Sequence, residues 1–294
     1  MRKFILGTDW WDDCDDVAAV RIIARAHKAE EICVMGIAIN ACMEYSVCSL
    51  EGFLNTEKVY DIPIGIDRNA IGLDGRTSYQ KMLSGYSLKY NSNSDGEDAV
   101  KMYRRILAES DEKIEIIEIG FLQVIANVLV SQADEISEKS GIELIKEKVS
   151  KIWVMGGRWD KEGGKENNFS RHKRARIAAN VFCDKCPVPV TFLGWEIGAD
   201  VITGDILDKN DILYDVYAGH GSGEGRFSWD PMLVLMALIG DEEKAGYDVI
   251  KGTASVEVTT GRNFFEVSET GNFGYVIKKK PNENYIDMIN EVIT

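Results

Sequence analysis

The residues best suited to chemistry lie in an acidic run near the start of the chain. Its carboxylates are Asp9, Asp12, Asp13, Asp15 and Asp16. Two unit charges about 4 Å apart interact by about 4 kcal/mol at an effective dielectric near 20, so this run needs compensation. One interpretation is a solvated turn whose Asp side chains cap the next helix. The neighbouring Trp10 and Trp11 would shield part of the run from water, which favours a bound cation instead. Oxygen ligands indicate calcium or magnesium.

Three kinds of cation or phosphate chemistry could use such a run. An EF-hand loop needs Gly at its sixth position and Glu at its twelfth, but counting from Asp9 those positions hold Cys14 and Val20. A phosphotransferase that forms an aspartyl-phosphate needs its nucleophile where this chain has Gly7. The third possibility, a hydrolase that holds a diol and a water on one cation, is compatible with these residues.

The segments around the run predict alternating strands and helices. Apolar residues from Phe4 to Leu6 precede it, and Val17–His27 has helical periodicity. Further strands are predicted at Ile32–Ile39, Ile62–Ile66, Ile114–Ile119, Lys148–Met155 and Pro187–Leu193, with strand-like pieces at Ser255–Thr259, Phe264–Val267 and Tyr275–Lys279. Further helices are predicted at Tyr45–Val59 and Ala99–Ala108, after Gly120, after Phe169 through Phe182, from Ser228 to Ile239 and from Tyr285. Asp67–Gly96 is polar and predicts a long loop.

This alternation predicts an α/β fold with a doubly wound, mainly parallel central sheet and helices on both faces. Ligands of such sheets bind beyond the carboxyl ends of the strands. The acidic run, the turn at Gly120, the sequence Met155-Gly156-Gly157 and the turn at Gly194 all fall at that edge. No linker or internal repeat is visible, so we expect residues 1–294 to form a single domain.

Composition excludes several partners. The formal net charge is −14, so no basic surface is expected for nucleic acid or for an anionic membrane. The apolar piece Phe4–Leu6 is too short for a signal peptide or a membrane span. The six cysteines are scattered, and the Cys183-x-x-Cys186 pair lacks further zinc ligands. We therefore expect a cytoplasmic protein with reduced thiols.

Six sequence blocks resemble, in the same order, those of the inosine–uridine-preferring nucleoside hydrolase family. The blocks are Gly7–Ala18, Gly120–Asn127, Val154–Gly157, Glu166–Phe169, Gly194–Gly198 and Ser228–Pro231. The resemblance runs from about Lys3 to Ile293. It implies the nucleoside hydrolase fold and a tightly bound Ca²⁺. The implied activity is hydrolysis of the N-glycosidic bond of a ribonucleoside, in a homodimer or homotetramer.

The resemblance also implies roles for individual residues. Asp9 matches a calcium ligand that is also the general base for water held on the cation. Asp16, Asp230 and the backbone carbonyl of Ile119 match the other calcium ligands. The matching residues that bind substrate are Asp15, which holds the ribose 2′-hydroxyl, Glu166 and Asn168, which hold ribose hydroxyls, and Asn40. Carboxylates near the sugar would stabilise an oxocarbenium-like transition state.

The sequence differs from the family at residues that support the metal site and at the residue linked to the leaving group. Gly7 stands where many members have an additional Asp, and Asp12 and Asp13 have no counterpart. Trp229 stands where several members carry a His linked to leaving-group activation. Stacking by tryptophan could replace that His, so Trp10 or Trp11 is expected to face the base, with Trp229 nearby.

Several alternatives stay open from the sequence. His172 and His220 fall near predicted site loops, although a histidine there is more commonly a surface residue. The basic stretch Ser170–Arg174 could meet a phosphate or simply offset the acidity. The protein could also be a non-catalytic ribose or nucleoside binder, or hydrolyse another ribosyl compound.

Overall fold

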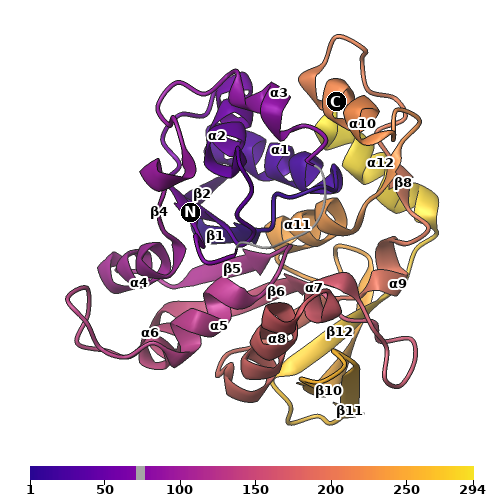
Figure 1. The fold of residues 1–294 in the computed structure, drawn as a ribbon. Coiled ribbons are helices and arrows are strands. Elements are labelled where there is room, and N and C mark those ends of the chain that lie inside the picture. Colours follow the sequence, from indigo (N-terminus) through magenta and orange to yellow (C-terminus); the bar gives the residue numbers. More distant parts are fainter. Residues whose placement is uncertain (71–76) are drawn as a thin grey trace.

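The computed structural model describes residues 1–70 and 77–294, which contain a ten-stranded central sheet (Figure 1). The order across the sheet is β11-β10-β12-β7-β6-β5-β1-β2-β3-β4. Its strands are β1 (Arg2–Thr8), β2 (Ile32–Ile39), β3 (Ile64–Ile66), β4 (Glu97–Asp98), β5 (Ile114–Glu118), β6 (Val149–Met155), β7 (Val190–Leu193), β10 (Tyr247–Val256), β11 (Asn263–Val267) and β12 (Phe273–Lys278). A separate two-stranded sheet pairs β8 (Ile202–Thr203) with β9 (Arg226–Phe227).

Most of the central sheet is parallel. Every pair from β4 across to β12 runs parallel, whereas β10 is antiparallel to both β11 and β12. The doubly wound, mainly parallel α/β fold predicted from the sequence is therefore confirmed. The parallel register places the carboxyl ends of β1, β2, β5 and β6 along one edge, where the predicted site blocks begin.

Helices cover both faces of this sheet (Figure 1). One face carries α1 (Asp15–Lys28), α2 (Ser46–Thr56), α10 (Ile212–His220), α11 (Trp229–Ile239) and α12 (Asn282–Ile293). The other carries α4 (Ala99–Glu109), α5 (Gln123–Val130), α6 (Gly141–Lys148) and α8 (Lys173–Lys185). The remaining helices are short: α3 (Gln80–Ser84), η1 (Asn93–Asp95), α7 (Asn167–Ser170) and α9 (Trp195–Gly198).

The middle of strand β1, Phe4–Leu6, is apolar because it is buried on both faces of the sheet. Phe4 and Leu6 pack into the core beneath α1 and α11, while Ile5 points into the core beneath α4 and α5. Successive side chains of a strand point to opposite faces, so a strand covered on both sides needs apolar residues at every position. This burial fixes the point at which the acidic run begins.

Some predicted elements differ from those observed. Strand β10 starts at Tyr247, although the prediction placed a strand at Ser255–Thr259. Its middle is largely exposed or half-buried, so the sequence there lacks a continuous apolar run. The expected loop Asp67–Gly96 contains α3 and η1, and residues 71–76 of that prediction lie outside the described residues. Helices α6 and α10 were not predicted.

The buried Arg21 of α1 joins segments that are distant in sequence. Its guanidinium donates to Glu57 Oε1 at 2.7 Å, to Asp211 Oδ1 at 2.6 Å and to the Ile293 carbonyl at 2.9 Å. Its side chain is 2% exposed, so these acceptors take the place of water. Helix α1 is thereby tied to α2, α10 and the end of α12.

All six cysteines have free thiols, and both members of the Cys183-x-x-Cys186 pair are buried. Neither cysteine of that pair belongs to a cluster of metal-ligand side chains found in residues 1–70 and 77–294. In the same residues, no helix has the length and apolarity to cross a membrane.

Gly7 is required because the carboxyl group of Glu118 occupies the space beside it. A Cβ at Gly7 would lie 2.0 Å from Glu118 Oε2. Glu118 is fully buried, Tyr103 donates a 2.8 Å hydrogen bond to its Oε1, and its Oε2 has no partner among the described residues. The neighbouring strand thus supplies a buried carboxyl group directly beside Gly7.

We expect Glu118 to make folding stability pH-dependent. Burial raises its pKa from 4.5 to about 8, so the folded protein binds a proton more tightly than the unfolded chain does. The stabilisation is complete below about pH 4.5 and is lost as the pH rises through about 8. The unfolding free energy of the wild type relative to Glu118→Gln should fall by about 1.4 kcal/mol per pH unit in that window.

Urea denaturation between about pH 4.5 and 8 measures this difference. Glu109→Gln is a suitable control, because Glu109 is exposed on α4 and should leave the pH profile of stability unchanged. Parallel profiles for the wild type and Glu118→Gln would contradict the prediction.

Candidate active site

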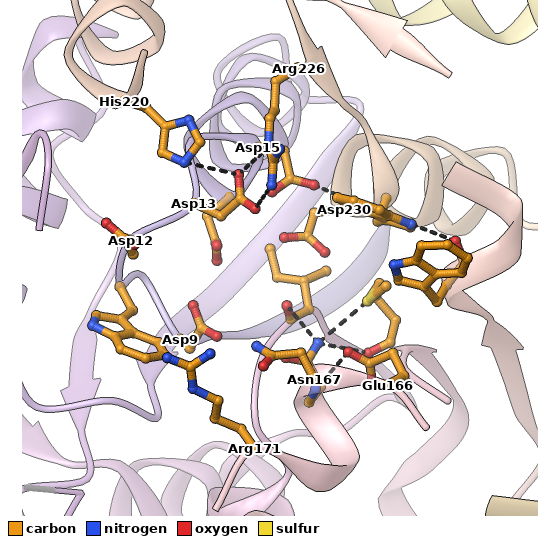
Figure 2. Close-up of a pocket in the computed structure, with 17 residues that line it drawn as sticks. Asp9, Asp12, Asp13, Asp15, Glu166, Asn167, Arg171, His220, Arg226 and Asp230 are labelled. Carbon is orange, nitrogen blue, oxygen red and sulfur yellow. Dashed lines mark hydrogen bonds and ion pairs between the residues drawn. The ribbon is translucent and has the colours of Figure 1, made fainter. Parts of the chain in front are cut away.

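A cavity of about 340 Å³ opens at the carboxyl edge of the parallel strands (Figure 2). The predicted site residues that line it are Asp9, Asp15, Asp16, Ile119, Glu166, Asn168, Trp229 and Asp230. They come from the ends of β1 and β5, the first turns of α1 and α11, and the segment around α7. The sequence blocks that suggested a site therefore meet at one place.

Two helix N-termini direct three of the carboxylates toward each other. Asp15 and Asp16 form the first turn of α1, and Asp230 lies in the first turn of α11. Oxygens of these three side chains lie within 4.8 Å of one another. The free N–H groups of a helix start favour negative charge. The Asp230 N–H, for instance, donates to Asp15 Oδ2 at 3.3 Å.

The carboxylates are buried, and none of them forms an ion pair with a side chain in residues 1–70 or 77–294. Asp9, Asp15, Asp16 and Asp230 are between 2% and 8% exposed. Burial, together with the nearby Asp13 carboxylate, raises the pKa of Asp9 to about 7. Burial and neighbouring carboxylates also hold the pKa values of the other three well above their usual range.

The donor set fits a hard metal cation. Among the described residues, no Lys or Arg side chain forms an ion pair with any of these four carboxylates. The Ile119 residue lines the same cavity, and its carbonyl accepts only a long 3.5 Å contact from Asn168 Nδ2. Buried carboxylate and carbonyl oxygens without a counter-charge are what Ca²⁺ or Mg²⁺ binds. The acidic cluster could therefore hold a metal ion.

Glu166 acts first as the N-cap of α7. Its Oε1 accepts from the Asn168 N–H at 2.6 Å, and its Oε2 accepts from the N–H groups of Gly157 at 3.1 Å and Phe169 at 3.3 Å. Burial raises the pKa of Glu166 to about 7, against the effect of these hydrogen bonds. A carboxylate has about four acceptor positions, so one remains for a ligand.

Asn168 ties α7 to the ends of two strands. Its Nδ2 donates to the Met155 carbonyl at 3.1 Å, which leaves its Oδ1 as an acceptor. The neighbouring Asn167 also lines the cavity and was missed, because only its flanking residues belong to the Glu-x-Asn pattern. The segment thus offers several polar groups to a hydroxylated ligand.

Of the two tryptophans expected to face the base, Trp11 lines the cavity and Trp10 does not. Trp10 is fully buried in the core, where its Nε1 donates to Ser49 Oγ at 2.8 Å and its ring packs edge-on against Tyr79. The backbone of Trp10 has φ 45°, a left-handed conformation that is rare for a large residue. This conformation accompanies a side chain turned away from the cavity, whereas Trp11 and Trp229 line it.

The contact between Asn40 and the substrate, which the resemblance implied, has no counterpart in this cavity. Asn40 is fully buried and does not belong to the cavity lining. Its Oδ1 accepts from the Phe121 N–H at 2.9 Å, and its carbonyl accepts from Gln123 Nε2 at 3.0 Å. Asn40 therefore holds the turn after β5 rather than lining the ligand space.

Several lining residues carried no assigned role in the sequence analysis. Arg226 Nε donates to Asp13 Oδ1 at 2.8 Å, and a second hydrogen bond joins the same two side chains. The guanidinium of Arg171 lies 4.9 Å from the centre of the Trp11 ring. His220 also lines the cavity, whereas His172 caps α8 and packs against Phe121.

The comparisons with known proteins concern the fold. No protein-family model matches the sequence, and no curated protein sequence matches it either. A structure titled inosine-uridine preferring nucleoside hydrolase from Bacillus anthracis has a TM-score of 0.73 at 12% identity, covering 100% of this chain and 99% of that one. The chain therefore shares its fold with this nucleoside hydrolase.

Two effector proteins share this fold. The type III effector protein XopQ, titled as complexed with adenosine diphosphate ribose, has a TM-score of 0.68 at 14% identity and covers 99% of this chain and 93% of its own. The effector protein XOO4466 has a TM-score of 0.63 at 13% identity with the same coverage. At such identities the likeness extends to the fold alone.

Proposed function

We propose that the protein hydrolyses the N-glycosidic bond of a ribonucleoside, giving ribose and the free base, in a Ca²⁺-dependent reaction. The observation that carries this proposal is the cluster of buried carboxylates, Asp9, Asp15, Asp16 and Asp230, at the strand edge of a nucleoside hydrolase fold. The polar α7 segment across the same cavity is suited to a ribose.

Asp9, Asp16, Asp230 and the Ile119 carbonyl would hold the Ca²⁺. When bound, this ion supplies positive charge that orients the ribose diol and makes the attacking water more acidic. It also compensates the carboxylates, whose burial without a cation raises their pKa values. The resting state of the site is then an ionised cluster rather than a protonated one.

The other catalytic and binding roles belong to side chains of the protein. Asp9 takes a proton from the water whose oxygen bonds to C1′, and the electrons of the C1′–N bond leave with the base. Asp15 accepts a hydrogen bond from the ribose 2′-hydroxyl, and Asn168 Oδ1 accepts one from another hydroxyl. The ring acquires positive charge as the bond breaks, and the nearby carboxylates stabilise that charge.

A panel of ribosides tests this proposal. The wild type should release reducing sugar from nucleosides and from nitrophenyl riboside, stop after treatment with a chelator, and recover on addition of Ca²⁺. The control is a boiled sample treated with the same metal. Absence of sugar release from every riboside in the presence of Ca²⁺ would contradict hydrolysis.

A non-catalytic ribosyl-binding protein is the second candidate. XopQ, which shares the fold, is titled as a complex with adenosine diphosphate ribose. Arg171 lies at the cavity and has no carboxylate partner among the described residues, so a charged ribosyl ligand could contact it. Ligand-induced thermal stabilisation without sugar release, across the same panel, would favour this second candidate.

A further inference from the structure

The leaving base needs a proton, and the residues assigned above do not supply one. This inference rests on the proposed hydrolysis. We propose that His220 is the general acid that protonates the departing base, and that Asp13 and Arg226 position it. Trp229 lines the cavity, but its indole N–H does not release a proton near neutral pH, so an acid would come from another element.

The end of α10 holds His220 in a defined place. His220 is the last residue of that helix, and Gly221 follows with φ 87°, the left-handed conformation of a helix C-cap. The N–H groups of Gly221 and Ser222 donate back to Ala218 and Tyr217 at 3.0 and 2.7 Å. The backbone that carries the imidazole is therefore fixed.

The imidazole is also oriented by its side-chain neighbours. Its Nδ1 lies 2.8 Å from Ser222 Oγ, and its Nε2 lies 4.0 Å from Asp13 Oδ1. Arg226 binds both oxygens of Asp13, which keeps that carboxylate from rotating. Since Nδ1 is occupied by the hydroxyl, Nε2 is the nitrogen that can serve a ligand.

His220 lies on the side of the cavity where a base would project. Figure 2 shows His220 and Glu166 at opposite sides, with Asp9 and Asp230 between them. If the ribose binds between the carboxylates and the α7 segment, its C1′ substituent extends away from α7. That direction leads toward the Asp13, Arg226 and His220 group.

Other lining residues are poorly suited to this step. The guanidinium groups of Arg171 and Arg226 do not release protons at physiological pH. The four buried carboxylates already bind the ribose, the water or the cation in the proposed mechanism: Asp9, Asp15, Asp16 and Asp230. Histidine is the side chain whose ordinary titration allows it to donate a proton near neutrality.

The proton balance of the reaction is then complete. As the C1′–N bond breaks, its electron pair goes to the base, and His220 Nε2–H passes its proton to a nitrogen or oxygen of that base. The water oxygen bonds to C1′, and the water proton goes to Asp9. Asp9 releases that proton to solvent, and His220 takes one from solvent before the next turnover.

Leaving-group dependence tests the role of His220. Nitrophenolate leaves without a proton, whereas the base of a nucleoside does not. His220→Ala should lower kcat for nucleosides by about 10²–10³ and change nitrophenyl riboside hydrolysis less than about threefold. Added imidazole should restore part of the nucleoside rate in this variant. The control, His27→Gln, lies at the far end of α1, where its ring contacts Asp61, and should match the wild type on both substrates.

Each outcome of this experiment supports or overturns the role of His220. Equal loss on both substrates, or no loss on either, would overturn the role of His220 while leaving the hydrolase proposal intact. A wild type that cleaves nitrophenyl riboside but no nucleoside would also overturn the role of His220, because no residue would then be protonating the leaving base. A wild type that cleaves neither substrate would overturn the proposed function, and the general acid with it.

Discussion

Replacing Asp9 by Asn should lower kcat for nucleosides by about 10²–10⁴, the usual contribution of a general base. Asn keeps the size of the side chain and removes its ability to take a proton from water. Asp9 lies at the end of β1 and is 8% exposed, so an isosteric change should preserve the local packing. Steady-state kinetics with a nucleoside and with nitrophenyl riboside measure the effect. Both substrates should lose rate, because both need an activated water.

Asp12→Asn is the matched control for that experiment. Asp12 lines the same cavity and carries the same charge, but it has no role in the proposed mechanism. Its kcat should stay close to that of the wild type. If Asp9→Asn retains near-normal kcat while its circular dichroism is unchanged, Asp9 is not the base.

Binding of Ca²⁺ should stabilise the folded protein strongly, because it relieves the repulsion among four buried carboxylates. A ligand present at 100 times its Kd adds about 2.7 kcal/mol to the free energy of unfolding. For a chain of this size the corresponding rise in Tm is about 5 °C. A thermal melt of metal-free protein, with and without Ca²⁺, measures this shift.

Substitutions in the cluster should abolish the shift. Asp16→Asn and Asp230→Asn each remove one carboxylate, so their Tm values should respond little to Ca²⁺. Asp184→Asn, at an exposed position beside Lys185, should keep the full response. Metal analysis that finds no divalent cation in purified protein, together with no shift in Tm, would contradict the Ca²⁺ site. A larger rise in Tm with Mg²⁺ than with Ca²⁺ would indicate that the site binds Mg²⁺ instead.

The parallel part of the fold was predictable because its strands are buried on both faces. Ile32–Ile39 is a continuous apolar run, whereas Ile114–Ile119 is a run of isoleucines interrupted by Glu115 and Glu118. The structure places β2 and β5 at these two segments within one residue. The antiparallel end was harder to predict. Strand β10 is exposed or half-buried over most of its length, so its sequence resembles that of a surface loop.

The carboxylate cluster was foreseeable, since each of its blocks follows a strand or starts a helix at the same edge. The orientation of the tryptophans was not foreseeable, because it depends on the left-handed backbone at Trp10. The pairing of Arg226 with Asp13 was also not predictable, since these residues lie 213 positions apart, Asp13 has no counterpart in the family and Arg226 lies outside the matched blocks. Long-range pairs of this kind leave no periodic signal in a sequence.

The Arg21 contacts bear on when the site can form during synthesis on a ribosome. Arg21 on α1 needs the Ile293 carbonyl, and the Asp15–Asp16 pair on the same helix needs Asp230. These contacts have a large sequence separation, so they close only after most of the chain has been made. A nascent chain that has not yet reached Asp230 carries the acidic run without its partner carboxylate. We therefore expect high-affinity metal loading to be a post-translational event, completed after the residues that secure α1 have left the exit tunnel.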